Sequence, residues 1–453
     1  MTRGLFAVLL FVSVAGCGRK FLTADPSGEV TRKLSDLAGL LAGQQLMAQT
    51  PVIGEQSAAE YYLLPDYYNL LSATDKNLYS WQKDIYEGQT GIPDWNIPYA
   101  QVYNCNVVLD ELAKIVPSAA NMREYNELYG RALFLRAYAF HNISQVFAKV
   151  YESDKADKEP GIVMPLRSDI STVPARSNMK DSYQKITADL IRAAGLLPDS
   201  VVNDSLQLPN KPAAYALLAR VYLSKLDYDS ALVYADSTLA YTKTLLNFNT
   251  LDLTNKFPVS GLNREIFYMS WLINTSNVIQ GRVIPGCIID SVLYKSYENN
   301  DLRKSAFFML SAGLPVFKGN YTGRSFAFSG LALDETLLIR AECRARKGNV
   351  QGAMNDLNYL LTNRYKEGTF NTFTANGITE ALEIIWKERR KELVFRGLRW
   401  PDLKRLNKEF PSITLSRKVN GISYKLLPGS NRYVLPIPDD VIKGTSILQN
   451  NRD

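Results

Sequence analysis

Histidine is almost absent from this chain of 453 residues, and its scarcity excludes several kinds of catalytic site. The single histidine, His141, lies in the apolar-rich run FLRAYAFHNISQVF. Ser-His-Asp and Cys-His sites need a histidine beside a nucleophile, and zinc sites of the H-E-x-x-H type need two. We therefore interpret His141 as a packed or capping residue of a helix. Hydrolysis by two carboxylates needs no histidine and stays open.

Cysteine is also scarce, with no C-x-x-C pair and no spacing typical of a metal site. Beyond Cys17, the three cysteines Cys105, Cys287 and Cys343 form an odd set, so we expect core residues and not a disulfide framework. The sequence predicts no metal site and no cofactor. Lys and Arg are spread along the chain without a basic block, which argues against nucleic-acid binding despite a formal charge of +7.

Long hydrophobic runs are missing as well, and the one apolar stretch stands at the N-terminus. Arg3 precedes the apolar segment 5–15, which is shorter than the roughly 20 residues that span a bilayer. Small residues then abut Cys17, as in a bacterial lipobox. We predict a signal peptide over 1–16, a lipidated Cys17 and a tether over 17–30, so that the chain is held at the membrane by its lipid. An ordinary secretory signal with a chance cysteine is the alternative.

The rest of the pattern predicts one mainly α-helical domain over 31–453, with large irregular loop insertions and few short strands. Helical periodicity covers 34–47, about 97–116, 122–149 and 178–197. We place the scaffold helices at about 97–240 and 333–406. The segment at about 245–330 is rich in Gly, Asn, Ser, Thr and aromatics, so we expect loops with a few strands there. A second irregular region begins at Pro411.

Two segments, 216–239 and 335–361, share a repeat pattern. Each has two alanines with the same spacing around a short polar turn, namely Ala219 and Ala231, and Ala341 and Ala353. This resembles the tetratricopeptide helix–turn–helix unit, in which small residues let two antiparallel helices cross closely. The units are not contiguous, which indicates a helical scaffold with insertions and not a uniform solenoid.

The most distinctive segment is ALEIIWKERRKELVFRGLRWPDLKRL at 381–406. Its apolar residues form one helical face, Gly397 is a plausible helix stop, and Trp400-Pro401 opens the next turn. The segment resembles the signature of the SusD/RagB family of outer-membrane nutrient-binding lipoproteins. Further segments resemble that family in the same order, at 17–22, 99–112, 130–140 and 433–451. Arg396 departs from the pattern, because the family usually has Glu there.

The resemblance implies a lid on a SusC-like TonB-dependent transporter that captures oligosaccharides, or less often peptides, for import. It also implies an outer-membrane location, anchored by lipid and facing the cell surface. We assign the charged signature residues a structural role, because half-buried ions persist only when they are paired. The structural set is Glu388, Arg389, Arg390, Glu392, Gly397, Arg399, Trp400 and Asp402.

A ligand site is expected among loop aromatics, whose rigid faces pack against sugar rings. The densest aromatic group lies at 61–95, and residues of the large insertion could face it. The candidate ligand-binding residues are Tyr67, Tyr68, Trp81, Trp95, Trp271 and Tyr321, with Asp66 and Asn96 as polar partners.

Two other functions remain open from the residues alone. One is a surface glycoside hydrolase with two carboxylates, although no local motif supports it. The other is a helical-repeat scaffold without a small ligand, which binds a partner protein.

Overall fold

The computed structural model describes residues 32–200, 206–274, 278–279, 286–410 and 412–453. The predicted signal peptide, Cys17 and the tether lie outside the described residues. Within the described ranges, no helix is both long enough and apolar enough to cross a membrane.

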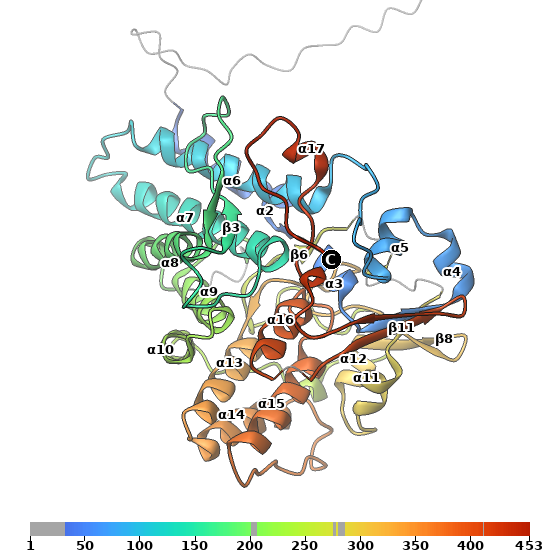
Figure 1. Cartoon of the computed structure of the whole chain (residues 1–453). Coiled ribbons are helices and arrows are strands. Elements are labelled where there is room, and N and C mark those ends of the chain that lie inside the picture. The colour runs from blue at the N-terminus through green and yellow to red at the C-terminus, as the bar shows by residue number, and fades with distance from the viewer. Residues whose placement is uncertain (1–31, 201–205, 275–277, 280–285, 411) are drawn as a thin grey trace, which may run out of the picture.

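The fold is mainly helical, as the sequence predicts, and consecutive long helices pack side by side. In Figure 1 they descend along the left half of the molecule, from α6 and α7 through α8, α9 and α10 to α13, α14 and α15. Their bounds are α6 (Pro93–Leu112), α7 (Met122–Phe147), α8 (Met179–Leu196), α9 (Lys211–Ser224), α10 (Tyr228–Leu239), α13 (Leu333–Arg346), α14 (Val350–Thr362), α15 (Ile378–Glu392) and α16 (Arg399–Glu409).

The two predicted tetratricopeptide-like pairs are α9–α10 and α13–α14, and their small residues lie at the helix crossings. All four alanines of the repeat pattern, Ala219, Ala231, Ala341 and Ala353, are fully buried. Leu226 and Gly348 both take left-handed backbone angles at the turns, with φ of 61° and 81°. Asp227 and Asn349 then cap the following helices. Although the pairs are far apart in sequence, α10 packs directly on α13.

Two predicted helices differ in extent from the structure. The helix expected at 34–47 is broken at Gly43 into α1 (Leu34–Ala42) and α2 (Gln44–Met47), because Gly43 has a non-helical ψ of 86°. The helix expected at about 97–116 runs from Pro93 to Leu112, and proline suits the first turn since it needs no donor there.

The insertion and the remaining segments form short helices and two-stranded sheets, in agreement with the expectation of few strands. The pairs are β1–β6 (parallel), β2–β7, β3–β4, β5–β10, β8–β9 and β11–β12. The strands are β1 (Gln49–Thr50), β2 (Tyr61–Leu63), β3 (Pro160–Val163), β4 (Arg176–Asn178), β5 (Ile266–Tyr268), β6 (Trp271–Leu272), β7 (Cys287–Ile289), β8 (Phe308–Ser311), β9 (Leu314–Phe317), β10 (Leu331–Ala332), β11 (Leu415–Val419) and β12 (Ile422–Leu426). The short helices are α3 (Ile53–Ser57), α4 (Pro65–Leu70), α5 (Ala73–Tyr79), α11 (Ser291–Ser296), α12 (Arg303–Phe307) and α17 (Asp439–Ile442), with 3₁₀ turns at Phe248–Thr250 and Asn431–Tyr433.

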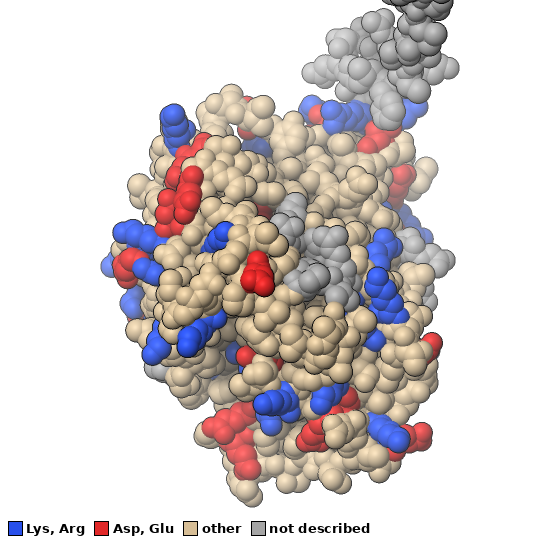
Figure 2. All heavy atoms as spheres, turned by 90° about the vertical axis from the view of Figure 1, so that its right-hand side faces the viewer, with Lys and Arg blue, Asp and Glu red and all other residues tan. Residues whose placement is uncertain are grey.

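Many of these short elements gather on the right-hand side of the molecule, where α4, α5, α11 and the strands labelled β8 and β11 lie (Figure 1). Seen from that side, charged side chains are scattered over the face, with uncharged surface between them (Figure 2). Exposed apolar side chains on α4, α11, β8 and β12 include Leu70, Val292, Leu310 and Ile422.

Candidate functional site

The charged signature residues of α15 belong to a buried ion-pair cluster that joins three parts of the chain. Arg303 of α12 is fully buried and pairs with Glu388 at 2.6 Å and Glu392 at 3.1 Å. Arg364 reaches the other oxygen of Glu392 at 2.7 Å. Burial opposes ionisation of Glu392, but Arg364 and Arg303 outweigh it and lower the pKa of this carboxyl. The cluster fixes the insertion against the helical scaffold.

The other signature residues make similar structural contacts. Arg389 donates to Asp402 of α16 at 2.8 Å. Arg390 and Arg399 both lie 3.1 Å from Glu60. The fully buried Trp400 donates from its indole nitrogen to the Tyr433 carbonyl at 3.1 Å. These side chains therefore cross-link elements distant in sequence.

Arg396, the departure from the family pattern, has its own partners. Its guanidinium donates to Asp334 and lies over the rings of Tyr321 and Phe328, at 5.0 and 4.7 Å. The next residue, Gly397, takes a φ of 74° and donates its N–H to Glu55 at 2.7 Å. The turn after α15 is thus held by α3.

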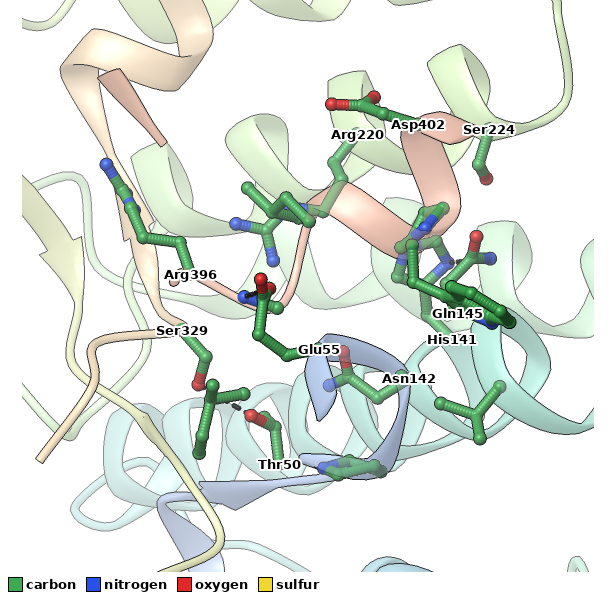
Figure 3. A pocket seen from close by; sticks show the side chains of 18 of the residues that line it. Thr50, Glu55, His141, Asn142, Gln145, Arg220, Ser224, Ser329, Arg396 and Asp402 are labelled. Carbon is green, nitrogen blue, oxygen red and sulfur yellow. Dashed lines mark hydrogen bonds between the residues drawn. The ribbon is translucent and has the colours of Figure 1, made fainter. Parts of the chain in front are cut away.

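A polar crevice of about 40 Å³ lies where α3, α7, α9 and α16 meet (Figure 3). Glu55 stands near its centre in this view, and His141, Asn142 and Gln145 of α7 line it on one side. Arg389 also lines it. Glu55 Oε1 and Arg389 Nη1 are buried and have no hydrogen-bond partner among the described residues.

Burial sets the protonation of the groups around this crevice. Desolvation, reinforced by the charge of Glu60, raises the pKa of Glu55 to about 8. Desolvation, with repulsion from Arg220, lowers the pKa of His141 to about 3, so this histidine is neutral at physiological pH. Burial disfavours the Asp402 carboxylate, but Arg389 and Arg405 lower its pKa below the ordinary range.

The crevice pairs a carboxyl of raised pKa, Glu55, with one of lowered pKa, Asp402. Such a pair would suit acid and nucleophile roles in glycoside hydrolysis. However, a volume of about 40 Å³ has room for on the order of one to three waters and not for a sugar ring. We therefore regard the crevice as an internal junction of the fold and not as a sugar site.

Glu55→Gln should remove a pH dependence of stability. The folded protein keeps the Glu55 proton up to about pH 8, whereas the unfolded chain releases it near the ordinary glutamate pKa of 4.5. Between these values the folded state binds more protons, so wild-type stability should fall as pH rises, by up to roughly 1.4 kcal/mol per pH unit. Urea unfolding at several pH values measures this, with the exposed Glu367→Gln as control. If the stability of Glu55→Gln fell with rising pH as steeply as that of the wild type, the raised pKa of Glu55 would be contradicted.

A larger hollow, of about 520 Å³, lies at the surface, and we name it the Trp271 basin. Its aromatic floor consists of Trp271 and Phe326, whose rings stack with centroids 5.7 Å apart and an interplanar angle of 21°. Phe257 adds a third ring. The lining residues are Gln44, Gln207, Asn255, Phe257, Pro258, Ser260, Gly261, Leu262, Met269, Trp271, Thr322, Gly323, Arg324 and Phe326.

Backbone pairing holds the basin floor in place. Trp271 begins strand β6, which pairs with β1, and its N–H donates to the Ala48 carbonyl at 2.9 Å. Two loops meet beside it at Gly261 and Gly323, where an added Cβ would lie within 3 Å of the facing backbone. Glycine is therefore required at this crossing. Arg324 is the one charged residue in the part of the lining that the structure describes.

The structure corrects three of the candidate ligand contacts, because their side chains are core residues. Trp81 is 2% exposed, and its indole nitrogen donates to the Ser57 carbonyl at 2.9 Å. Trp95 is 6% exposed and packs edge-on against Phe147. Tyr321 is 1% exposed, with its hydroxyl donating to Glu265 at 2.7 Å. Tryptophan and tyrosine occur both in hydrophobic cores and in ligand-binding sites, so their position in a loop did not distinguish a core residue from a ligand contact.

The remaining candidates do not form one site. Tyr67 and Tyr68 lie half-buried on α4, while Asp66 and Asn96 are exposed on α4 and α6. None of these four lines the Trp271 basin. Of the predicted ligand-binding residues, Trp271 alone lines the basin. Phe326, which lies in the same insertion, lines it as well. The roles of Tyr67, Tyr68, Asp66 and Asn96 in binding remain predictions.

Sequence reasoning missed the polar half of the basin. Gln44, Gln207 and Asn255 come from three segments distant in the chain, and no local pattern connects them. A weak signal existed in the run NKFPVSGLN at 255–263, which combines an aromatic, Pro and Gly in the way of a binding loop.

Comparison with protein families supplies the wider context. A family model described as "Starch-binding associating with outer membrane" matches residues 20–223, and the SusD family model matches residues 332–452. The chain belongs to the SusD family. Members of this family are carbohydrate-binding proteins associated with the outer membrane. The SusD-like protein P2 of Formosa agariphila is 24% identical over 426 residues, covering 79% of each chain.

Solved structures share the fold of this SusD family member. A putative sugar-binding protein from Bacteroides vulgatus has a TM-score of 0.75 and 21% identity, covering 93% of this chain and 99% of the other. A SusD superfamily protein from Bacteroides thetaiotaomicron has a TM-score of 0.70 and 19% identity, covering 92% and 98%. A laminarin-binding SusD-like protein has a TM-score of 0.66 and 17% identity, covering 92% and 99%.

Proposed function

We propose that this SusD family protein captures an oligosaccharide in the Trp271 basin and delivers it to a partner SusC-like TonB-dependent transporter. The observation that carries the proposal is the stacked Trp271–Phe326 floor, with amide side chains along the same hollow. Flat aromatic faces pack against sugar rings, and amide groups exchange hydrogen bonds with sugar hydroxyls. Because β1 holds Trp271 in place, little conformational entropy is lost on binding.

The lining of the basin also indicates how charge affects recognition. Arg324 is exposed, and it is the one charged side chain among the described residues that line the basin. A neutral oligosaccharide should therefore bind with little salt dependence, whereas an acidic one should bind less tightly as salt screens Arg324. Comparing Arg324→Gln with the wild type at low and high salt separates the two ligand classes.

The proposal is tested by calorimetric titration of the full chain with a panel of neutral and acidic oligosaccharides, combined with chromatography of the sugars after incubation. We expect at least one class to bind reversibly and to be recovered intact. Release of shorter products would establish a hydrolase. An absence of binding across the whole panel would contradict oligosaccharide capture and favour a scaffold that binds only a partner protein.

We favour oligosaccharide binding over glycoside hydrolysis as the function. The acidic pair Glu55 and Asp402 lies in a crevice too small for a sugar ring. Among the residues that the structure describes, no Asp or Glu lines the Trp271 basin. Retaining and inverting hydrolysis both need two carboxyl groups beside the sugar.

Delivery to a transporter requires a surface that can pack against it. On the side shown in Figure 2, uncharged surface lies between scattered charged side chains. Its elements expose Leu70, Val292, Leu310 and Ile422, and exposed apolar side chains can contribute to such a contact. Asn420 at the β11–β12 turn donates to Asn69 of α4 at 2.8 Å, so this turn and α4 are joined to one another.

We also propose that the protein is anchored by lipid in the outer membrane and faces the cell surface. Cys17→Ala should abolish acylation, because the lipidation chemistry needs the thiol at the predicted cleavage site, and the protein should leave the membrane fraction. Metabolic labelling with a fatty acid and fractionation measure both effects. Cys105→Ala, at a buried cysteine, is the control and should stay labelled. Labelled Cys17→Ala protein would disprove the assignment.

A further inference from the structure

A line of four tyrosines runs along the α9–α10 pair, and none of them lines the Trp271 basin. In spatial order they are Tyr241, Tyr215, Tyr234 and Tyr222, with successive ring centroids 6.3, 6.0 and 5.4 Å apart. Tyr234 and Tyr222 stack almost in parallel, at 6°. We call this set the tyrosine ladder.

The ladder arises from matched spacing on two antiparallel helices. Tyr215 and Tyr222 lie two turns apart on α9, and Tyr234 and Tyr241 repeat this spacing on and just after α10. Residues with this spacing share one helix face, so the rings of the two helices alternate along one line. In Figure 1, α9 lies between α8 and α10.

The ladder is also the accessible strip of α9. Apart from Lys211 at its first position, Tyr215 and Tyr222 are the only residues of α9 that are not buried. Tyr241 is 41% exposed. Solubility alone would favour charged residues at these positions, and the chain instead presents aromatic ones.

The polar atoms of the ladder are available to a ligand. Among the described residues, no hydrogen bond involves the hydroxyl of Tyr215, Tyr222 or Tyr234. Charged groups lie toward the two ends: Lys225 lies 5.0 Å from the Tyr222 ring, and Asp199, which pairs with Lys211, accepts from the Tyr241 hydroxyl. The middle of the ladder therefore offers apolar ring surface and neutral hydroxyls.

We propose that the tyrosine ladder is a second carbohydrate-binding surface, which takes a linear neutral glycan along the α9–α10 pair. The ring spacing is comparable to the repeat of a chain of pyranose units, so successive sugars would meet successive rings. The free hydroxyls would bond the sugar hydroxyls, and the lack of charge in the middle selects a neutral chain. This inference rests on the proposed carbohydrate capture and assigns it a second surface, which would hold a long polysaccharide while one part enters the basin.

The test is affinity electrophoresis of the full chain in native gels that contain laminarin, starch, xylan or mannan. We first identify a polysaccharide that retards the wild type. The double variant Tyr222→Ala/Tyr234→Ala should bind this polysaccharide with an apparent affinity about tenfold lower, because losing one of two linked sites removes avidity. The matched control is Tyr125→Ala/Tyr129→Ala, another partly buried tyrosine pair, with ring centroids 6.2 Å apart on α7. Thermal melting of each variant checks folding.

Each outcome is decisive. Loss of retardation in the ladder variant and not in the control supports the ladder. If the ladder variant runs as wild type while Trp271→Ala is impaired, the ladder is overturned and basin capture stands. If Trp271→Ala runs as wild type while the ladder variant is impaired, the ladder stands and the basin fails. The proposal is also contradicted if the ladder and control variants lose retardation equally. It is contradicted as well if none of the four polysaccharides retards the wild type. An unfolded ladder variant is replaced by Tyr222→Gln/Tyr234→Gln, which is judged by the same criteria.

Discussion

Arg303→Met should lower the free energy of unfolding by about 3–5 kcal/mol, which is the usual effect of removing one partner from a buried ion cluster. Arg303 is completely buried and pairs with Asp301, Glu388 and Glu392. Methionine of similar length would leave these carboxylates in an apolar setting with fewer partners. Urea denaturation at neutral pH measures the loss.

The pH dependence of this variant provides a second readout. In the wild type, burial opposes ionisation of Asp301, but Arg303 and Lys391 outweigh it and lower its pKa. This contribution to stability is present above the unfolded-state pKa and is lost as pH falls. The difference between wild type and Arg303→Met should therefore shrink toward acidic pH. The control is Arg264→Met, at an exposed arginine of the same insertion. A loss at neutral pH no greater than that of the control would disprove the structural role of the cluster.

Trp271→Ala should weaken oligosaccharide binding by about ten- to a hundredfold, or roughly 1.5–3 kcal/mol, without unfolding the protein. The indole is half-buried, stacks on Phe326 and forms the floor of the basin. Its removal leaves the β1–β6 backbone pairing unchanged. Calorimetric titration with the tightest-binding oligosaccharide of the panel measures the change.

A matched control exists in Trp386, which is also half-buried beside a phenylalanine, Phe410, at 5.3 Å, and lies outside the basin. Trp386→Ala should bind as wild type does. Equal losses in both variants would indicate a general effect of removing a surface tryptophan. Unchanged binding in Trp271→Ala would contradict the basin as the capture site.

For the substitution Trp81→Ala, the structure predicts a different effect from the one that the sequence predicts. An aromatic residue in a segment broken by Pro and Gly indicates a ligand contact that could be removed without unfolding. In the structure, Trp81 takes a φ of 52° and lies under the Arg417 guanidinium, 4.7 Å from its ring. A cavity in the core is therefore the expected result of its removal, and stability is the property that should change.

The sequence alone determined the features that depend on local order. Helical periodicity, the repeated alanine spacing around Leu226 and Gly348, and the signature from Glu388 to Asp402 each lie within a short stretch. A pattern of this kind is readable because helix geometry places its members on one face. The family and its mainly helical fold followed from these stretches.

Only the tertiary structure decided which side chains meet. The basin forms because β6 pairs with β1 and two loops cross at glycines, which brings together Trp271, Phe326, Asn255 and Gln207. The same folding buries Trp81, Trp95 and Tyr321. Burial and the assembly of a site depend on contacts between distant segments, whose energies are set by packing and desolvation and leave no periodic trace in the chain.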